Sequence, residues 1–316
     1  MQFWFKRWAV VASLIGLAAC GGNDEDHAPP APGTIAQVAQ ANGLNALVAA
    51  ATKAGLVPAL SGAGTLTVFA PTDAAFNTLA TRLGFTDATA LVNALPASAL
   101  ASILNYHVLA TRQTAADLST GANTRPTLYS FGGSAATLSV GTTGGVTLTD
   151  AVLTAANVVT ANVPASNGIV HVVDKVLVPP GVLTVVQMAR ANPQFSSLVS
   201  AVSSAGLAST LSGAGPFTVF APVNDAFTAI SSTVAGLTTA QLTTVLTYHV
   251  LGSQVLSTAI PFGTPVATVS GQTITINASP LRITDKTATP APIVATDIRA
   301  SNGVIHVISK VLIPTL

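Results

Sequence analysis

The sequence has few charged residues, few aromatic residues and a single cysteine. Charged side chains account for 7% of the 316 residues and aromatic ones for 5%, and beyond Lys6-Arg7 the basic residues are scattered singly. Nucleic-acid binding needs clustered basic residues to neutralise phosphates, and base stacking needs aromatic side chains. The composition therefore excludes nucleic acid as a partner. Hydrophobic residues make up 49% of the chain, which is ample material for a core.

The single cysteine, Cys20, follows a segment that is typical of a signal peptide over residues 1–19. Lys6 and Arg7 precede an apolar, charge-free run at 9–19, which is too short to span a bilayer but fits a signal-peptide core. The run ends in Leu-Ala-Ala-Cys, which resembles the bacterial lipobox. We therefore expect Cys20 to carry a palmitate-type lipid anchor, so that no thiol remains for an intramolecular disulfide. An ordinary signal peptide followed by an unmodified cysteine is the alternative.

The residues after Cys20 predict a membrane-attached protein of the cell envelope. By analogy with Gram-negative lipoproteins, Gly21 indicates the outer membrane, with the protein on its periplasmic or outer surface. Residues 20–33 are polar, acidic and rich in proline, so we expect a flexible tether with a reach of roughly 20 Å. Its three consecutive acidic residues lack the spacing of a calcium-binding loop.

The rest of the chain contains an internal repeat of domain size. Three motifs occur twice in the same order, at 65–76 and 216–227, at 103–109 and 245–251, and at 166–179 and 301–314. The offset between copies shrinks from 151 to 142 and then to 135 residues, so the second copy has shorter connecting segments. The repeat predicts two domains, at 34–179 and 181–316. The Pro179-Pro180 step between them restricts the backbone, so we expect limited movement at this junction.

Each copy has helical patterns first and strand patterns later. Apolar residues recur at helical spacing from Ile35 and again from Val185, and a second helical stretch precedes each Tyr-His pair. The later part of each copy alternates threonine and valine, which is typical of strands. The predicted strands are 67–70 and 169–178 in the first copy and 218–221 and 304–313 in the second, and strand-like alternation covers 137–149 and 266–276.

Two local features follow from turn and capping chemistry. The Leu-Ser-Gly-Ala-Gly segments that begin at Leu60 and Leu211 predict turns. Asp73, and Asn224 or Asp225 in the second copy, are the expected N-caps of the helices that carry Phe76 and Phe227; the short apolar strand before each helix ends at a proline.

The repeated motifs resemble those of the fasciclin domain family. They read Thr-Val-Phe-Ala-Pro with Ala-Phe, then Tyr-His, then Asn-Gly-x-x-His-Val-x-x-Lys-Val-Leu-x-Pro, and the resemblance covers nearly everything after Thr34. It implies an α+β fold of two tandem fasciclin-like domains, each a wedge-like β-sandwich with helices packed on one side. It also implies cell adhesion or contact with extracellular matrix, with an unidentified surface protein or polysaccharide as partner, and no shared enzymatic reaction.

The histidines of the motifs are the most evident candidates for metal or acid–base chemistry. The motif residues are Tyr106, His107 and His171 in the first copy and Tyr248, His249 and His306 in the second. A zinc site usually needs at least three protein ligands, and no further cysteine or histidine is available. Asp174 is a possible third ligand, but Ser309 replaces it in the second copy. We therefore predict hydrogen-bonded core histidines in apolar, strand-like runs, and no metal or cofactor.

The sequence also lacks the common catalytic motifs. It has no Gly-x-Ser-x-Gly elbow, and its Gly-Ala-Gly turns lack the Gly-Lys-Ser/Thr of a phosphate loop. After the tether there are eight aspartates and no glutamate, which leaves little for paired carboxylates. We expect no enzyme and no catalytic residue. A hydrolase is the less favoured alternative, since it needs a Ser-His-Asp geometry that sequence cannot show.

One pair of residues resembles an adhesion feature of the family. In some animal members an Asp-Ile pair before the Asn-Gly-x-x-His segment is implicated in integrin binding. Asp297-Ile298 matches that position, whereas the first copy has Asn162-Val163. We expect these positions to be exposed, and the second copy to be the binding half. The interpretation that the residues favour is that Asp297 caps a turn and Ile298 fills the edge of the core, and the partner role is the less favoured one.

These observations predict a lipid-anchored envelope protein that mediates adhesion or surface interaction through two domains. The alternative function is a periplasmic or surface carrier that holds an apolar or glycan ligand between the domains, which requires a sizeable apolar cavity.

Overall fold

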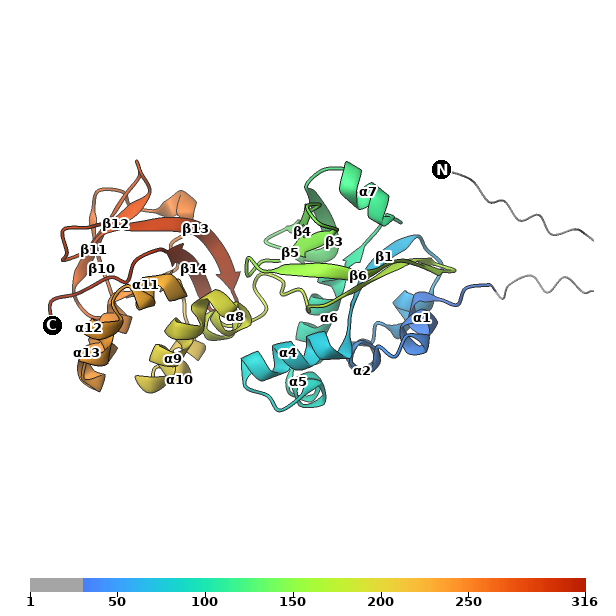
Figure 1. The fold of residues 1–316 in the computed structure, drawn as a ribbon, viewed down its shortest axis with the longest axis horizontal. Coiled ribbons are helices and arrows are strands. Elements are labelled where there is room, and N and C mark those ends of the chain that lie inside the picture. Colours follow the sequence, from blue (N-terminus) through green and yellow to red (C-terminus); the bar gives the residue numbers. More distant parts are fainter. Residues whose placement is uncertain (1–30) are drawn as a thin grey trace, which may run out of the picture. The chain divides into compact units, whose positions relative to one another are not determined.

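The structure is a computed structural model that describes residues 31–316 (Figure 1). The predicted signal peptide, the predicted lipidation site at Cys20 and most of the tether lie outside the described residues. Within the described part, no single helix has the length and hydropathy to cross a membrane, although the bent helix pair 88–94 and 97–106 meets those criteria together.

The first domain consists of a helical half followed by a strand-rich half, as the sequence predicts. The helical half contains α1 (Ile35–Ala41), α2 (Asn45–Lys53), α3 (Val57–Ser61), β1 (Leu66–Pro71), α4 (Asp73–Leu83), α5 (Ala88–Ala94) and α6 (Ala97–Tyr106). The second half contains β2 (Val108–Leu109), α7 (Ala115–Thr120), β3 (Thr124–Phe131), β4 (Ser134–Gly141), β5 (Thr147–Thr149), β6 (Ala155–Ala165) and β7 (Gly168–Val173).

The second domain repeats this order with shorter connections. Its helical half contains α8 (Val185–Ala191), η1 (Pro193–Phe195), α9 (Ser196–Ser204), α10 (Ala208–Ser212), β8 (Phe217–Pro222), α11 (Asn224–Thr228), α12 (Ser231–Ala235) and α13 (Thr239–Tyr248). The rest contains β9 (Val250–Leu251), η2 (Ser257–Ala259), β10 (Pro265–Ala267), β11 (Thr273–Asn277), β12 (Arg282–Thr284), β13 (Ala291–Ala300) and β14 (Gly303–Ile308).

Each domain is built on a seven-stranded sheet, with the order β2-β1-β7-β6-β5-β4-β3 in the first and β9-β8-β14-β13-β12-β11-β10 in the second. Strand β1 pairs in parallel with β7, and β8 with β14, while the other pairs are antiparallel. The long strands β6 and β13 have register shifts along their length. Bulges of this kind bend a strand, so one part of β6 pairs with β5 and the other with β7.

Most of the helices of each domain cover one face of its bent sheet. In Figure 1, α2, α4 and α5 lie below the strands of the first domain and α7 lies above them. Residues of β1 alternate between two sides: Val68 and Ala70 pack against the helices, whereas Phe69 packs against Leu138 and Leu148 between the strand layers. This period of two is the signature of a strand buried on both faces. The predicted α+β fold is confirmed.

Four of the helices begin at a threonine that forms a capping box. Thr34 and Thr184 start the first helix of each domain, and in each case a glutamine three residues later bonds back to the threonine backbone. Thr114 and Thr238 start α7 and α13 with the same kind of box, in which Asp117 and Gln241 bond back to the threonine backbone. Such caps satisfy the free N–H groups of the first turn, which is useful in helices this short.

The predicted caps at Asp73, Asn224 and Asp225 are wrong. Thr72 caps α4, since its hydroxyl accepts from the Ala75 N–H at 3.1 Å. Asp73 instead accepts from the Ala46 N–H at 2.8 Å and therefore caps α2. Asn224 does the same for α9 by accepting from the Ser197 N–H at 3.0 Å, and the N-cap of α11 is Val223, which makes no side-chain bond.

Two other boundaries differ from expectation. Leu60 and Leu211 belong to the short helices α3 and α10, and the turns begin only at the following glycines. The last strand of each domain is also shorter than predicted, because β7 ends at Val173 and β14 at Ile308. The segments that follow leave the sheet to make the contacts with His107 and His249 that are described next.

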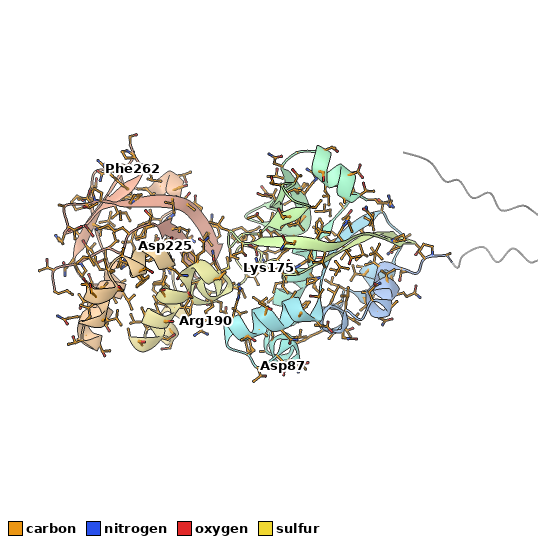
Figure 2. The ribbon with its side chains drawn as sticks, in the orientation of Figure 1. Asp87, Lys175, Arg190, Asp225 and Phe262 are labelled. Carbon is orange, nitrogen blue, oxygen red and sulfur yellow. The ribbon has the colours of Figure 1, made fainter. Side chains whose placement is uncertain are left out.

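Residues 32–316 form one compact unit, and hydrogen bonds connect residues of the two repeats within it. Arg82 on α4 donates to the Ala191 carbonyl at 3.0 Å, and Arg190 on α8 donates to the Leu83 carbonyl at 3.2 Å (Figure 2 labels Arg190). Each guanidinium thus caps the last turn of the other helix, where a cation is favourable.

Candidate functional site

The Tyr-His pairs lie where a helix ends and the sheet begins. His107 is the C-cap of α6, and the residue is 1% exposed. Nδ1 lies 2.7 Å from the Ile103 carbonyl, and the Leu177 N–H points to Nε2 at 2.9 Å. A carbonyl can only accept and an N–H can only donate, so Nδ1 carries the proton.

His249 repeats this arrangement in the second domain. Its Nδ1 donates to the Val245 carbonyl at 2.8 Å, and its Nε2 accepts from the Leu312 N–H at 2.8 Å. Burial disfavours the imidazolium and lowers the pKa of both His107 and His249 to about 4. Both rings are neutral near pH 7. The expectation that they lie in strand-like runs is wrong, since both end a helix.

His171 and His306 lie within the central strands β7 and β14 and use the opposite tautomer. His171 Nε2 donates to the Gln113 carbonyl at 2.9 Å, and Nδ1 accepts from the Asn162 N–H at 3.3 Å. His306 makes the equivalent bonds to the Val255 carbonyl at 2.9 Å and the Asp297 N–H at 3.3 Å. Burial lowers the pKa of both rings.

All eight nitrogens of the four motif histidines therefore contact main-chain groups. A metal ligand or general base needs a free nitrogen lone pair, and here each acceptor nitrogen already receives a main-chain N–H. In the part of the chain that the structure describes, no group of three His, Cys, Asp or Glu side chains is placed to hold a metal ion.

The tyrosines of the motif connect the helix to the outer strands. The Tyr106 hydroxyl donates to the Thr137 carbonyl at 3.0 Å, and that of Tyr248 to the Thr273 carbonyl at 2.9 Å. Burial raises the pKa of Tyr106, and raises that of Tyr248 to about 12. Both phenols therefore stay protonated and serve as donors.

A duplicated ion pair was missed by the sequence reasoning. The Lys175 ammonium lies 2.5 Å from an Asp150 carboxylate oxygen, and Lys310 lies 2.7 Å from Asp285 (Figure 2 labels Lys175). Both carboxylates are fully buried as side chains. Burial lowers the pKa of Lys175, and the attraction of Asp150 offsets part of this effect. The two aspartates are 135 residues apart, as are the two lysines. This shared offset is the sequence feature that could have predicted the ion pairs.

Each buried aspartate also binds main-chain groups. Asp150 accepts from the N–H groups of Val152, Thr154 and Val178. Asp285 accepts from the N–H groups of Thr287 and Ile313, at 2.9 Å each. The Lys-Val-Leu-x-Pro end of each repeat is thus attached to the loop between β5 and β6 in the first domain and between β12 and β13 in the second.

The Asn-Gly step of each last motif closes the helical half. Asn167 accepts from the Ile35 N–H at 2.9 Å and donates to the carbonyls of Leu60 and Gly62. Asn302 makes the equivalent bonds in the second domain. A Cβ on Gly168 would lie 2.2 Å from the Leu66 carbonyl oxygen, so only glycine fits beside β1.

Asp297 and Ile298 lie at the bulge of β13, and their surroundings differ from expectation. Ile298 is 3% exposed, so it fills the edge of the core as the structural interpretation predicts, and the expectation that both positions are exposed is wrong for Ile298. Asp297 is half-buried, with φ of +62°. Its carboxylate accepts from the Ser257 N–H at 2.9 Å and from the Ser257 hydroxyl, at the start of η2. Asn162, with φ of +60°, accepts from the Ala115 N–H at 2.9 Å in the same way.

An apolar cavity of about 120 Å³ lies inside the first domain, beside α1, α2, α3, β1 and α6. The equivalent place in the second domain, beside α8, α9 and α13, holds about 30 Å³. Sequence reasoning considered a cavity between the domains. It missed this one, because helix packing that leaves a gap has no local sequence pattern.

Comparisons with known proteins match both domains to one family model. The model of the Fasciclin domain matches residues 42–179 and 193–314. Protein sll1483 of Synechocystis is 40% identical over 139 residues, which covers 42% of this chain and 75% of that protein. Transforming growth factor-beta-induced protein ig-h3 of Sus scrofa is 33% identical over 151 residues, covering 46% of this chain and 21% of that protein.

One solved structure extends over both domains. A FAS1 domain pair from the insect cell adhesion molecule fasciclin I covers 89% of this chain and 95% of that chain, at 18% identity and a TM-score of 0.43. At that score the likeness carries no argument about function. The match to ig-h3 spans about a fifth of that protein, so its whole-protein role does not transfer directly.

Proposed function

We propose, from the premise that this chain belongs to the fasciclin domain family, that it mediates adhesion or surface contact at the cell envelope through its two domains. We further propose that Cys20 carries the lipid that holds the protein at the outer membrane. A non-enzymatic role fits a family in which the matched relatives are not named as enzymes.

One observation supports an interaction module most strongly. The polar residues that recur in both copies are committed to internal contacts, with histidines, asparagines and buried aspartates bonded to main-chain groups. Such residues build the fold, whereas function is determined by particular surface groups. Because the repeated polar residues bond within the fold, we infer that each domain recognises partners through its exposed surface.

The anchor is tested by Cys20→Ser. The variant should block lipidation, leave unprocessed precursor and abolish incorporation of labelled palmitate, because the acceptor thiol is gone. Fractionation of envelopes, with wild type and a Ser13→Ala variant as matched controls, measures this effect. Processing and membrane fractionation identical to wild type in Cys20→Ser would contradict the anchor.

Adhesion is tested with cells that display the full chain. Cells with the protein should attach to surfaces coated with envelope polysaccharide or matrix protein better than cells that lack it. Soluble mature chain 20–316 with Cys20→Ser should compete for this attachment. Equal attachment with and without the protein on every coated surface would count against an adhesive role.

A carrier of an apolar ligand is the second candidate, and the cavity of the first domain favours it. The hydrolase alternative has no such support, because the motif histidines bond to main-chain atoms rather than to serine hydroxyls.

A further inference from the structure

We propose that the cavity of the first domain binds the alkyl end of a neutral amphiphile, and that the second domain lacks this site because two larger side chains fill it. This inference goes beyond adhesion and rests on the second candidate function, because it names the ligand class and the one domain that would bind it.

The lining and size of the cavity determine what it can hold. Its walls are mostly aliphatic, formed by residues such as Leu47, Ala51, Leu56, Leu60, Val68 and Leu104, and no Phe, Tyr or Trp side chain lines it. Apolar cavities of about 150 Å³ stay dry and take up benzene. A cavity of about 120 Å³ therefore has room for an alkyl segment of about six carbons. Each methylene that enters is removed from water, which favours binding.

The polar residues around the cavity determine the head group. Gln40 and Thr52 are exposed and Asn105 is half-buried, and no charged side chain lines the cavity. His107 also lines it, but both of its ring nitrogens bond to the main chain. A hydroxyl or amide head can bond to these neutral side chains, whereas a carboxylate would lose water without gaining a cationic partner. The ligand is therefore neutral at its head.

The second domain provides an internal comparison. Its smaller cavity is lined by the equivalents of many of the same residues, including Leu198, Val219 and Leu246. Val186 replaces Ala36 and Val202 replaces Ala51, and both valines are 8% exposed. The added methyl groups fill the space, leaving about 30 Å³, which is about enough for one water molecule.

The test uses mature chain 20–316 with Cys20→Ser, which keeps every described element and carries no lipid. Calorimetry with straight-chain alcohols from 1-butanol to 1-decanol measures affinity, and methyl NMR shifts locate the site. We expect one site, an affinity that rises about fourfold per methylene up to 1-hexanol, and little gain beyond it. Hexanoate should bind at least tenfold more weakly than 1-hexanol.

Matched variants of the two domains decide the assignment. Ala36→Val with Ala51→Val should lower the 1-hexanol affinity at least tenfold, while the melting temperature stays equal or rises because a cavity is filled. Each single substitution should give a partial loss, which guards against a double variant that fails to fold. Val186→Ala with Val202→Ala should add a second site. The proposal is overturned by unchanged affinity in the folded double variant, by affinity that keeps rising to 1-decanol, or by two sites in wild type.

Discussion

The two domains use the same polar contacts to hold helix and sheet together, yet they differ in how their helices pack. His107 and His249 make the same pair of main-chain bonds, and so do His171 and His306. The cavity volumes beside these helices nevertheless differ, at about 120 Å³ and about 30 Å³. Directional hydrogen bonds therefore fix how the helices and the sheet are arranged, while the apolar side chains packed between the helices can differ in size.

This difference between the domains distinguishes buried polar residues from apolar residues at the equivalent positions of the two repeats. Buried polar groups tolerate little change, because an unpaired donor or acceptor in the core costs about 1–3 kcal/mol. Alanine and valine at a helix–helix contact differ only in filled volume. Divergence between the copies is therefore expected at such apolar positions and on the surface, and the cavity difference has this origin.

Because the two domains bury equivalent histidines, a fall in pH should destabilise both domains, and this is the largest effect that we expect. His107 and His249 have folded-state pKa values of about 4, below the unfolded value of roughly 6.5. The unfolded chain thus binds protons first, so stability is fully present above about pH 6.5 and is lost as the pH falls toward 4. At pH 4, each of the two histidines should have lowered the free energy of unfolding by roughly 3 kcal/mol. Urea unfolding from pH 7.5 to 4 measures this loss.

Single replacements assign the acid effect to each domain. His107→Ala and His249→Ala should each cost about 1–3 kcal/mol at pH 7.5, because a buried main-chain N–H loses its acceptor. Each should also reduce the steepness of the pH dependence by a similar amount. A stability that stays flat between pH 6.5 and 4.5 would contradict the neutral, buried state of these rings, and unequal slopes would break the similarity of the domains.

Loss of one buried ion pair should cost about as much stability as protonation of one histidine, and the cost should differ between the domains. Asp150→Ala should cost about 3 kcal/mol, because it leaves the Lys175 ammonium and several N–H groups without their acceptor. Asp285→Ala should cost about 2–3 kcal/mol, since the Lys310 side chain is 24% exposed against 18% for Lys175 and regains water more easily. Urea unfolding at pH 7.5 compares the two variants.

Asp174→Ala serves as the control for these pairs. Asp174 is exposed and bonds to Asn157 on the neighbouring strand, so its loss should cost no more than about 1 kcal/mol. A cost for Asp150→Ala as small as that for Asp174→Ala would mean that the buried pair contributes little to the fold.

Sequence reasoning predicted the elements whose pattern is local. The alternation around Phe69 gives β1, and the apolar spacing around Leu47 and Leu198 gives helices, because side-chain direction repeats within a few residues. The Asp150–Lys175 pair joins residues 25 positions apart, and no local pattern states that such residues meet. Asp73 accepts a hydrogen bond from α2, which precedes it in the chain. Capping preferences consider only the helix that follows the residue, so they wrongly assigned Asp73 as the N-cap of α4.

The sequence alone could not decide between an exposed and a buried Ile298, for a related reason. Alternation along a strand tells inward from outward positions only while the register is continuous. The register of β13 shifts between Ala295 and Ile298, and Asp297 takes a positive φ there. A bulge changes which residues face the core, so Ile298 is buried next to a residue whose carboxylate reaches the surface loop.

The bulge positions Asn162 and Asp297 should show the smallest effect on stability and the most direct test of unequal binding. Both have positive φ, which asparagine and aspartate tolerate, so exchange between them leaves the backbone intact. Asp297→Asn replaces one carboxylate oxygen that accepts from Ser257, and should cost about 1 kcal/mol. Asn162→Asp keeps the bond to the Ala115 N–H and should change stability by less.

Attachment of cells that display each variant then tests whether the second domain is the binding half. Ile298 is buried, so the exposed part of the Asp-Ile pair is the Asp297 carboxylate, and loss of its charge should weaken contact with the partner. We expect Asp297→Asn to reduce attachment and Asn162→Asp to leave it at the wild-type level. Because both variants should stay folded, reduced attachment reports on recognition rather than on unfolding. Equal attachment by both variants and wild type would show that the partner binds elsewhere on the two domains.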